Sequence, residues 1–261
     1  MTTELVIALI SAAVAIVSAG LTIWGQTKSA RVAADLENFR RTEERLHERE
    51  KSVARYREPL GRAAYDLQSR LYNILQQRLI RKYYDNGTDR ERSYVVNNTV
   101  FLAAQYFAWT EIIRREIQFL DLGTDEKTRQ LARLQDGIYT LWQNDKFGPL
   151  FRVFAGEQRA IGECMIRGGP MGDRCIGYGA FLNQDEKRKD QLLDALKADV
   201  RSFSTHLEEA RPRLIALQNA LIDLLDFLDP NHIRFPKDRR EKIRANSKVM
   251  VEPRGIEPLT S

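Results

Sequence analysis

The chain opens on a continuous apolar run, and apolar residues recur afterwards every three, four or seven positions. The run from Leu5 to Trp24 reads LVIALISAAVAIVSAGLTIW and contains no charged residue. A helix of this length rises by ~1.5 Å per residue and covers the hydrocarbon core of a bilayer, which is roughly 30 Å thick. Ser11, Ser18 and Thr22 can donate to the carbonyl one turn earlier, so lipid tolerates them. The pattern predicts a transmembrane helix over residues 5–24.

Two other interpretations of this run are open. A cleavable signal peptide has a basic start and an apolar stretch of about 7–15 residues, whereas this run is longer and residues 1–4 include no Lys or Arg. A buried soluble helix would need neighbours on every face. Cytoplasmic flanks collect basic residues, and here Lys28, Arg31, Arg40 and Arg41 all follow the run. We therefore expect a single-pass protein with its N-terminus outside and its C-terminal domain in the cytoplasm.

Residues 27–57 form a charged segment without Gly or Pro in which an apolar residue recurs at every seventh position. The second apolar position that a coiled coil requires is charged. The apolar positions are Val32, Phe39, Leu46 and Val53, and the charged ones are Glu43, Glu50 and Arg57. The segment is predicted to be a helical stalk. It is either a solvated single helix or a weak dimeric coiled coil that makes the protein a homo-oligomer.

A helical domain is predicted over residues 59–230. Glu58-Pro59 is expected to end the stalk, because a residue before proline disfavours the helical conformation. Apolar residues at helical spacing then predict helices over 60–79, over about 93–122, from Thr124 to Trp142, and over about 150–165. A last long helix begins at Asn183 or Asp185 and is expected to kink or restart at Pro212. Its final part, 214–228, is apolar on most faces, which is typical of the centre of a bundle.

One irregular stretch interrupts this helical pattern. Residues 168–179, GGPMGDRCIGYG, hold five glycines. Cys-Met-Ile-Arg before the stretch and Arg-Cys-Ile-Gly-Tyr within it can pair as a small hairpin near 163–179, closed by the loop Gly-Gly-Pro-Met-Gly-Asp. An irregular loop is the alternative. The predicted fold class is thus all-α, with a single N-terminal transmembrane helix, a helical stalk, and a cytoplasmic bundle that has a possible hairpin.

The C-terminal residues 231–261 are strongly basic. Seven Lys and Arg residues against two acidic ones between Arg234 and Lys248 give a net charge of +5, which equals that of the whole chain. The rest of the chain is therefore electrically balanced, which argues against a broad nucleic-acid-binding face. We expect a solvated, disordered tail, with a contact to anionic lipid as the second interpretation. Nucleic acid is an unlikely partner, because Phe235 is the one aromatic residue in the tail.

Composition excludes several classes of protein. A chain of 261 residues with 43% hydrophobic and 30% charged residues is not wholly disordered. Two cysteines, Cys164 and Cys175, cannot form a disulfide framework, and a reducing cytoplasm would leave them unbonded. The glycine-rich stretch has neither the Lys-Ser/Thr of a phosphate loop nor the third glycine of a dinucleotide fingerprint. The three histidines are too dispersed for a zinc site. We expect no cofactor and no metal.

Few residues invite a chemical role. Asp223 and Asp226 share a helical face, which favours a solvated stripe over a pair of acting carboxylates. Arg159 and Glu163 lie four residues apart on the helix that precedes the glycine-rich stretch, and the simplest interpretation is an ion pair within one helix. The alternative is a ligand or partner site made by Arg159, Glu163 and Tyr178.

The sequence favours a non-enzymatic protein that binds a protein partner from a membrane anchor. The motivation is an anchor, a stalk and a helical body without a recognisable catalytic set. The general organisation resembles that of bacterial membrane-anchored helical proteins, which implies the plasma (inner) membrane and no mechanism. The alternative is a membrane-tethered enzyme or small-ligand sensor that uses residues 168–179.

Overall fold

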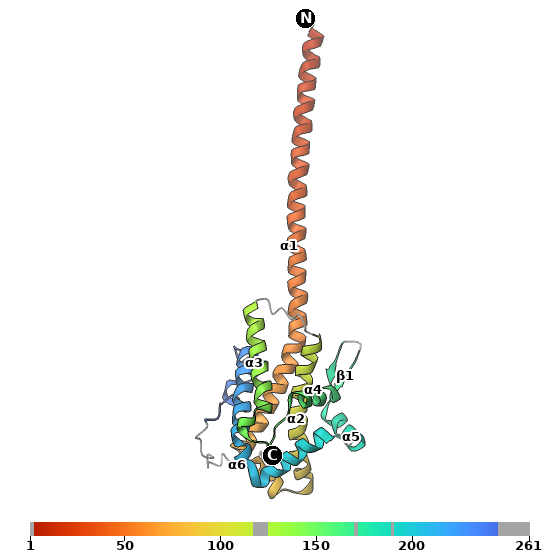
Figure 1. Cartoon of the computed structure of the whole chain (residues 1–261). Coiled ribbons are helices and arrows are strands. Elements are labelled where there is room, and N and C mark those ends of the chain that lie inside the picture. The colour runs from red at the N-terminus through yellow and green to blue at the C-terminus, as the bar shows by residue number, and fades with distance from the viewer. Residues whose placement is uncertain (1–2, 117–124, 170–171, 189–190, 245–261) are drawn as a thin grey trace, which may run out of the picture. The chain divides into compact units, whose positions relative to one another are not determined.

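The computed structural model describes residues 3–116, 125–169, 172–188 and 191–244, without some side chains in the first helix and at helix ends. The described chain is mostly helical and has one small antiparallel sheet, as the sequence predicts (Figure 1). The elements are α1 (Thr3–Leu75), η1 (Ile80–Asp85), α2 (Asp89–Glu116), α3 (Asp125–Gln143), η2 (Asp145–Phe147), α4 (Ala155–Cys164), β1 (Ile166–Arg167), β2 (Arg174–Cys175), α5 (Tyr178–Arg188), α6 (Gln191–Leu228) and η3 (Lys237–Arg239). The chain divides into two units, Met1–Ser52 and Val53–Ser261, which are described separately.

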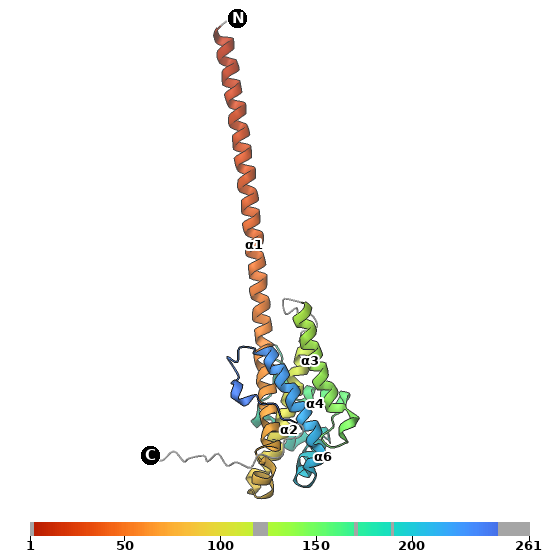
Figure 2. The same cartoon turned by 90° about the vertical axis from the view of Figure 1, so that its left-hand side faces the viewer.

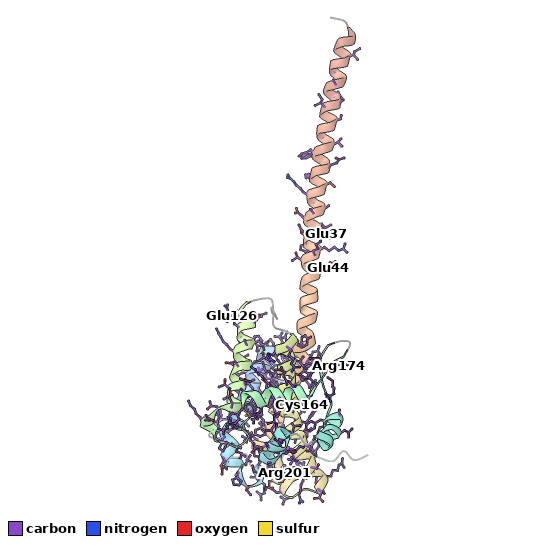
Figure 3. The ribbon with its side chains drawn as sticks, turned by 45° about the vertical axis from the view of Figure 1, so that its right-hand side comes forward. Glu37, Glu44, Glu126, Cys164, Arg174 and Arg201 are labelled. Carbon is purple, nitrogen blue, oxygen red and sulfur yellow. The ribbon has the colours of Figure 1, made fainter. Side chains whose placement is uncertain are left out.

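The first unit holds the N-terminal part of α1. Its hydroxyl side chains bond as expected for an apolar helix, since Ser18 donates to the Val14 carbonyl and Thr22 to the Ser18 carbonyl, both at 2.8 Å. Further along, Glu37 accepts from Arg41 at 3.0 Å and Glu44 lies 3.4 Å from Arg40. Figure 3 shows both glutamates on the same stretch of helix. These pairs stabilise a solvated helix only slightly.

The prediction of a membrane span gains no structural support. Within the part of the chain whose side chains the structure describes, no helix is both long enough and apolar enough to cross a bilayer. The predicted span itself lies partly outside the described side chains, at positions 5, 6, 8, 9, 11, 13, 17, 19 and 23.

The expected break at Pro59 is absent. Instead, α1 runs through Pro59 to Leu75, and the boundary between the two units falls at Ser52 and Val53. A proline inside a helix removes one main-chain hydrogen bond. Long-range contacts hold the helix on either side of it, because Arg57 Nε donates to the Leu228 carbonyl at 2.6 Å and Leu60 is buried. Tertiary contacts here outweigh a local preference.

The second unit is a bundle around a single hydrophobic core. In two views α3 lies alongside α6, and α2 and α4 pack against one another (Figures 1 and 2). The later part of α6 is central, as the sequence predicts, with its leucines fully buried at positions 214, 217, 221, 224 and 225. Trp142 of α3 packs against α2 and the loop before α4. Its ring centroid lies 4.9 Å from that of Phe107 of α2 and 5.2 Å from that of Phe151.

Several helix boundaries differ from those predicted: α1 ends at Leu75 rather than at residue 79, and α4 starts at Ala155 rather than near residue 150. α2 starts at Asp89 rather than near residue 93, because Thr88 and Glu91 form a capping box. The Glu91 side chain accepts from the Thr88 main-chain nitrogen at 2.7 Å. The helix predicted from residue 183 is divided into α5 and α6, and α6 is kinked at His206 (φ −122°, ψ 22°), six residues before Pro212. The helix end predicted near Gly123 and Thr124 lies outside the described residues.

The hairpin forms where the sequence predicts it. β1 and β2 pair antiparallel with Ile166 opposite Cys175 and Arg167 opposite Arg174, so residues 168–173 are the connecting loop. The Ile176 main-chain nitrogen extends the pairing by donating to the Met165 carbonyl at 2.8 Å. Figure 3 marks Cys164 at the end of α4 and Arg174 on β2.

The prediction of a disordered tail is wrong for residues 231–244. The Asp229 carboxylate accepts from the main-chain nitrogens of Ile233, Arg234 and Phe235 at 3.0–3.1 Å, which turns the chain back onto the bundle. Phe235 is then buried and stacks on Tyr65, with ring centroids 5.1 Å apart. Net charge alone did not predict this order, because basic side chains of the segment bind residues of the bundle. Lys242 Nζ, for example, lies 2.5 Å from Asp223 Oδ1. Residues 245–261 lie outside the described ones.

A glycine allows α4 to approach α2 closely. A Cβ atom at Gly162 would lie 2.8 Å from the carbonyl oxygen of Phe107 and 3.3 Å from the nitrogen of Ala108. Because both contacts are with main-chain atoms, a rotamer change could not relieve them. The side chain's absence therefore fixes the separation of the two helices.

Candidate functional site

A cleft of about 710 Å³ lies between α2, α3 and α4. Its apolar lining comes from Tyr106, Phe107, Ile113, Ala132 and Tyr139. Its charged lining consists of Arg114, Arg133 and Arg159 together with Glu111 and Asp136. The volume is that of a pocket for a small molecule or for one or two side chains of a partner.

Glu111 anchors the charged edge of this cleft. It is only 3% exposed and accepts from Arg114 Nε and Nη2 at 2.7 and 2.6 Å, and from Arg115 Nε at 2.7 Å. Burial alone would raise the pKa of Glu111, but the hydrogen bonds and charges of the two arginines outweigh burial and lower the pKa. A carboxylate held this tightly by two guanidinium groups is a poor general base. It acts as a structural anion that positions the arginines.

The predicted pair Arg159–Glu163 is not formed. Glu163 instead accepts from Arg115 Nη2 at 2.7 Å, which links α4 to α2 through the Glu111 cluster. Arg159 lines the cleft with an exposed side chain, and no other described residue forms an ion pair with it. Both residues come from α4, but Arg159 lines the cleft, whereas Glu163 pairs with Arg115 of α2.

Tyr178 lies elsewhere. Its ring contacts Phe101 at 5.2 Å and Tyr94 at 6.3 Å, both on the first half of α2. Phe101 and Glu111 are ten residues apart on one helix, which is about 15 Å at ~1.5 Å per residue. Tyr178 thus does not share a site with Arg159 and Glu163.

Tyr106 provides a buried polar group beneath the cleft. Its side chain is 2% exposed, and Thr110, one helical turn later, is the polar side chain that interacts with its hydroxyl. Burial raises the pKa of this phenol, so the hydroxyl keeps its proton at neutral pH. The cleft therefore combines apolar surface with a buried phenol and an arginine rim.

A second, more polar pocket of about 580 Å³ lies between α1, α2 and residues 238–241. Arg70 of α1 is 8% exposed at its wall, and its Nη2 donates to the Asn98 side-chain oxygen and to the Tyr94 hydroxyl, the latter at 3.4 Å. Burial lowers the pKa of Arg70. Tyr178 belongs to this neighbourhood, because it also lies close enough to Arg70 to interact electrostatically.

Among the residues that the structure describes, no group of three or more His, Cys, Asp or Glu side chains is arranged to hold a metal ion. Burial raises the pKa of the Cys175 thiol to about 12, which keeps it protonated and unreactive at neutral pH.

Comparison with known proteins found no match: no family model fits the sequence, and no curated protein and no solved structure matches it. The candidate sites therefore depend on geometry alone. The Glu111 cluster could have been found in the sequence, because Glu111, Arg114 and Arg115 follow the three- and four-residue spacing of helical ion pairs. Arg70 gave one weak signal, a lone arginine between Leu67 and Leu71 on an apolar face.

Proposed function

We propose that this chain is a single-span membrane protein whose helical unit binds a protein partner and carries out no reaction of its own. The observation that carries the proposal is the cleft between α2, α3 and α4, which has an apolar floor and a rim of arginines. Of the two carboxylates in its lining, the buried one, Glu111, is held in ion pairs with Arg114 and Arg115, which favours a recognition role over proton transfer for that residue.

The membrane anchor rests on the uncharged run of residues 5–24. Its large side chains that the structure describes are all at least 59% exposed, at Ile7, Ile10, Val14, Ile16, Leu21 and Trp24. Apolar surface of this extent is unfavourable in water and is covered by lipid in a membrane. The basic residues that follow support an orientation with the C-terminal unit in the cytoplasm of a bacterial cell.

Topology is tested with fusions after Arg244, the last described residue. An alkaline phosphatase fused there should be inactive in a bacterium, because that enzyme needs the oxidising side of the membrane to form its disulfides. A fluorescent protein at the same position should give a signal at the membrane. An active phosphatase would reverse the topology, and fluorescence throughout the cytosol would exclude the anchor.

The partner chemistry follows from the lining of the cleft. Arg133 and Arg159 are exposed at its rim, and neither has an ion-pair partner among the described residues. An apolar cleft floor next to cations without ion-pair partners fits a partner segment that presents an apolar side chain flanked by Asp or Glu. The partner's charges would strengthen association most at low ionic strength.

Charge reversal at the rim tests this. Full-length protein purified in mild detergent should capture a partner that mass spectrometry identifies, and Arg133→Glu with Arg159→Glu should abolish the capture. Arg129→Glu is a matched control, because Arg129 lies on α3, the helix of Arg133, but outside the cleft, where it pairs with Glu126. Capture that is unaffected by the double reversal would assign the partner to another surface.

The alternative that uses residues 168–179 has no comparable support. The hairpin places this segment in the second unit, and neither of the two clefts described above is lined by any of its residues. A homo-oligomer through the stalk is compatible with the proposed anchor and is addressed by its own prediction below.

A further inference from the structure

The polar pocket between α1, α2 and residues 238–241 contains charges of both signs that do not neutralise one another. Arg70 is its buried cation, Arg239 is a second, exposed cation, and Asp66, Asp238 and Glu241 are carboxylates in its lining. Among the described residues, none of these five side chains forms an ion pair. We propose that this pocket binds a small zwitterion, with the anionic group of the ligand at Arg70 and its cationic group at the carboxylates.

The arginine end of the pocket is incomplete. Arg70 Nη2 has partners in Asn98 and Tyr94, but Nη1 is buried with no hydrogen-bond partner among the described residues. A desolvated guanidinium without a carboxylate is costly, and proteins rarely bury one unless a charge compensates it. Nη1 is therefore the donor of this pocket-lining arginine that is left for the carboxylate of a ligand. Asn98 also lines the pocket and holds the group at its wall.

The acidic end is formed by two different segments. Asp66 lies one helical turn before Arg70 on α1, which separates them by about 6 Å along the helix axis. Asp66 is partly buried, which raises the pKa of its carboxyl group, although the nearby Arg62 opposes this. Asp238 and Glu241 come from the C-terminal segment, which Gln68 holds by donating to the Arg239 carbonyl at 3.1 Å. An ammonium group satisfies carboxylates in this arrangement better than a metal ion, which would need converging ligands.

The size and polarity of the pocket limit the class of ligand. About 580 Å³ admits a free amino acid with room for water, and the lining also offers amide and hydroxyl groups for hydrogen bonds. A purely anionic ligand would meet three carboxylates, and a purely cationic ligand would meet a buried arginine. A molecule that carries an ammonium and a carboxylate group matches both ends. This inference does not depend on the cleft between α2, α3 and α4.

Binding is tested on the full-length protein in mild detergent with the free α-amino acids as probes at millimolar concentration. At least one of them should raise the melting temperature in a concentration-dependent way, because a ligand that binds only the folded state stabilises it. Acetate and ethylamine, which each carry one of the two charges, should give no such rise. If no amino acid stabilises the protein, or if acetate or ethylamine alone stabilises it equally well, the proposal is wrong.

Variants then locate the bound probe by titration calorimetry. Arg70→Met should weaken binding at least tenfold, whereas Arg90→Met, an exposed arginine of α2 outside the pocket, should leave it unchanged. Should Arg70→Met fail to fold, Asp238→Asn provides the second measurement, because this exposed carboxylate carries no core contact and its loss should weaken binding severalfold. Wild-type affinity in Arg70→Met, or in Asp238→Asn when that variant is the one measured, would overturn the assignment.

Discussion

Arg213 donates from Nη1 to the carbonyl oxygen of Trp142 at 2.8 Å, although the two residues are 71 positions apart. The Arg213 side chain is fully buried, and its guanidinium also donates to the carbonyls of Leu141, Asn144, Gly148 and Leu150. α3 ends at Gln143, so these acceptors include carbonyls that have no partner within the helix. A cation beside them is also favoured by the negative end of the helix dipole. One side chain of α6 thus holds the end of α3 and the loop after it.

Replacing this cation should destabilise the protein strongly. Arg213→Met removes five hydrogen bonds and leaves buried carbonyls unsatisfied, which should lower the free energy of unfolding by about 2–5 kcal/mol. Arg213→Lys keeps the charge but lacks the forked donors, so it should recover part of the loss. Urea denaturation followed by circular dichroism measures both. Equal stability of Arg213→Met and wild type would mean that the carbonyls find other partners.

The core of α6 gives a second prediction. Leu221 and Leu225 are fully buried, whereas Asp223 between them is half exposed and pairs with Lys242. Truncation of either leucine to alanine should cost about 2–5 kcal/mol, while Asp223→Ala should cost about 1 kcal/mol or less. Thermal unfolding of the three variants gives the comparison. Two silent leucine variants would be incompatible with a central α6.

Acid should release the turn at Asp229. Burial alone would raise the pKa of this carboxyl group, but three main-chain N–H donors and Arg240 outweigh burial and lower the pKa. A lowered pKa means that the carboxylate stabilises the fold fully above the unfolded-state pKa of about 3.9 and loses this contribution as pH falls through the folded-state value. Asp229→Asn should therefore be less stable than wild type at pH 7, and the difference should shrink in acid. Urea midpoints from pH 2 to pH 7 test this, and a constant difference would refute it.

The stalk has an apolar stripe that a second chain could cover. Val32, Leu36 and Phe39 follow helical spacing on one face of α1 and are each at least 60% exposed. If they form a dimer seam, Val32→Ser with Phe39→Ser should lower chemical crosslinking between chains in the membrane. Ala34→Ser with Asn38→Ser is the matched control on another face and should leave crosslinking unchanged. Unchanged crosslinking in the seam variant would favour the solvated single helix.

Much of the fold could be predicted from local pattern. Apolar spacing of three and four gave the helices of the bundle, because each needs a covered stripe. The small hairpin could be placed at the loop Gly168–Asp173, because glycines there interrupt two short segments of matched length. The start of α2 was missed although its signal was present, since Thr88 and Glu91 have the spacing of a capping box.

The remaining features depend on residues far apart in the chain. The helix passes through Pro59 because Arg57 bonds to Leu228, 171 residues later, and no local preference contains that contact. Likewise, the tail was predicted to be disordered from its charge, but Arg240 is buried against Asp229. The three residues singled out as a possible site are not brought together, because Arg159 lines one cleft, Glu163 pairs with Arg115 on another helix, and Tyr178 packs on Phe101.

Because Gly162 has no side chain, substitutions at this position can change the width of the α2–α3–α4 cleft. Phe107, whose carbonyl faces Gly162, is itself part of the cleft lining. A methyl group at this position would act as a wedge and push α4 outward while every lining side chain stayed the same. Alanine, serine and valine at residue 162 form a series of increasing side-chain volume. Binding measured across this series would relate the width of the cleft to the size of the group that enters it.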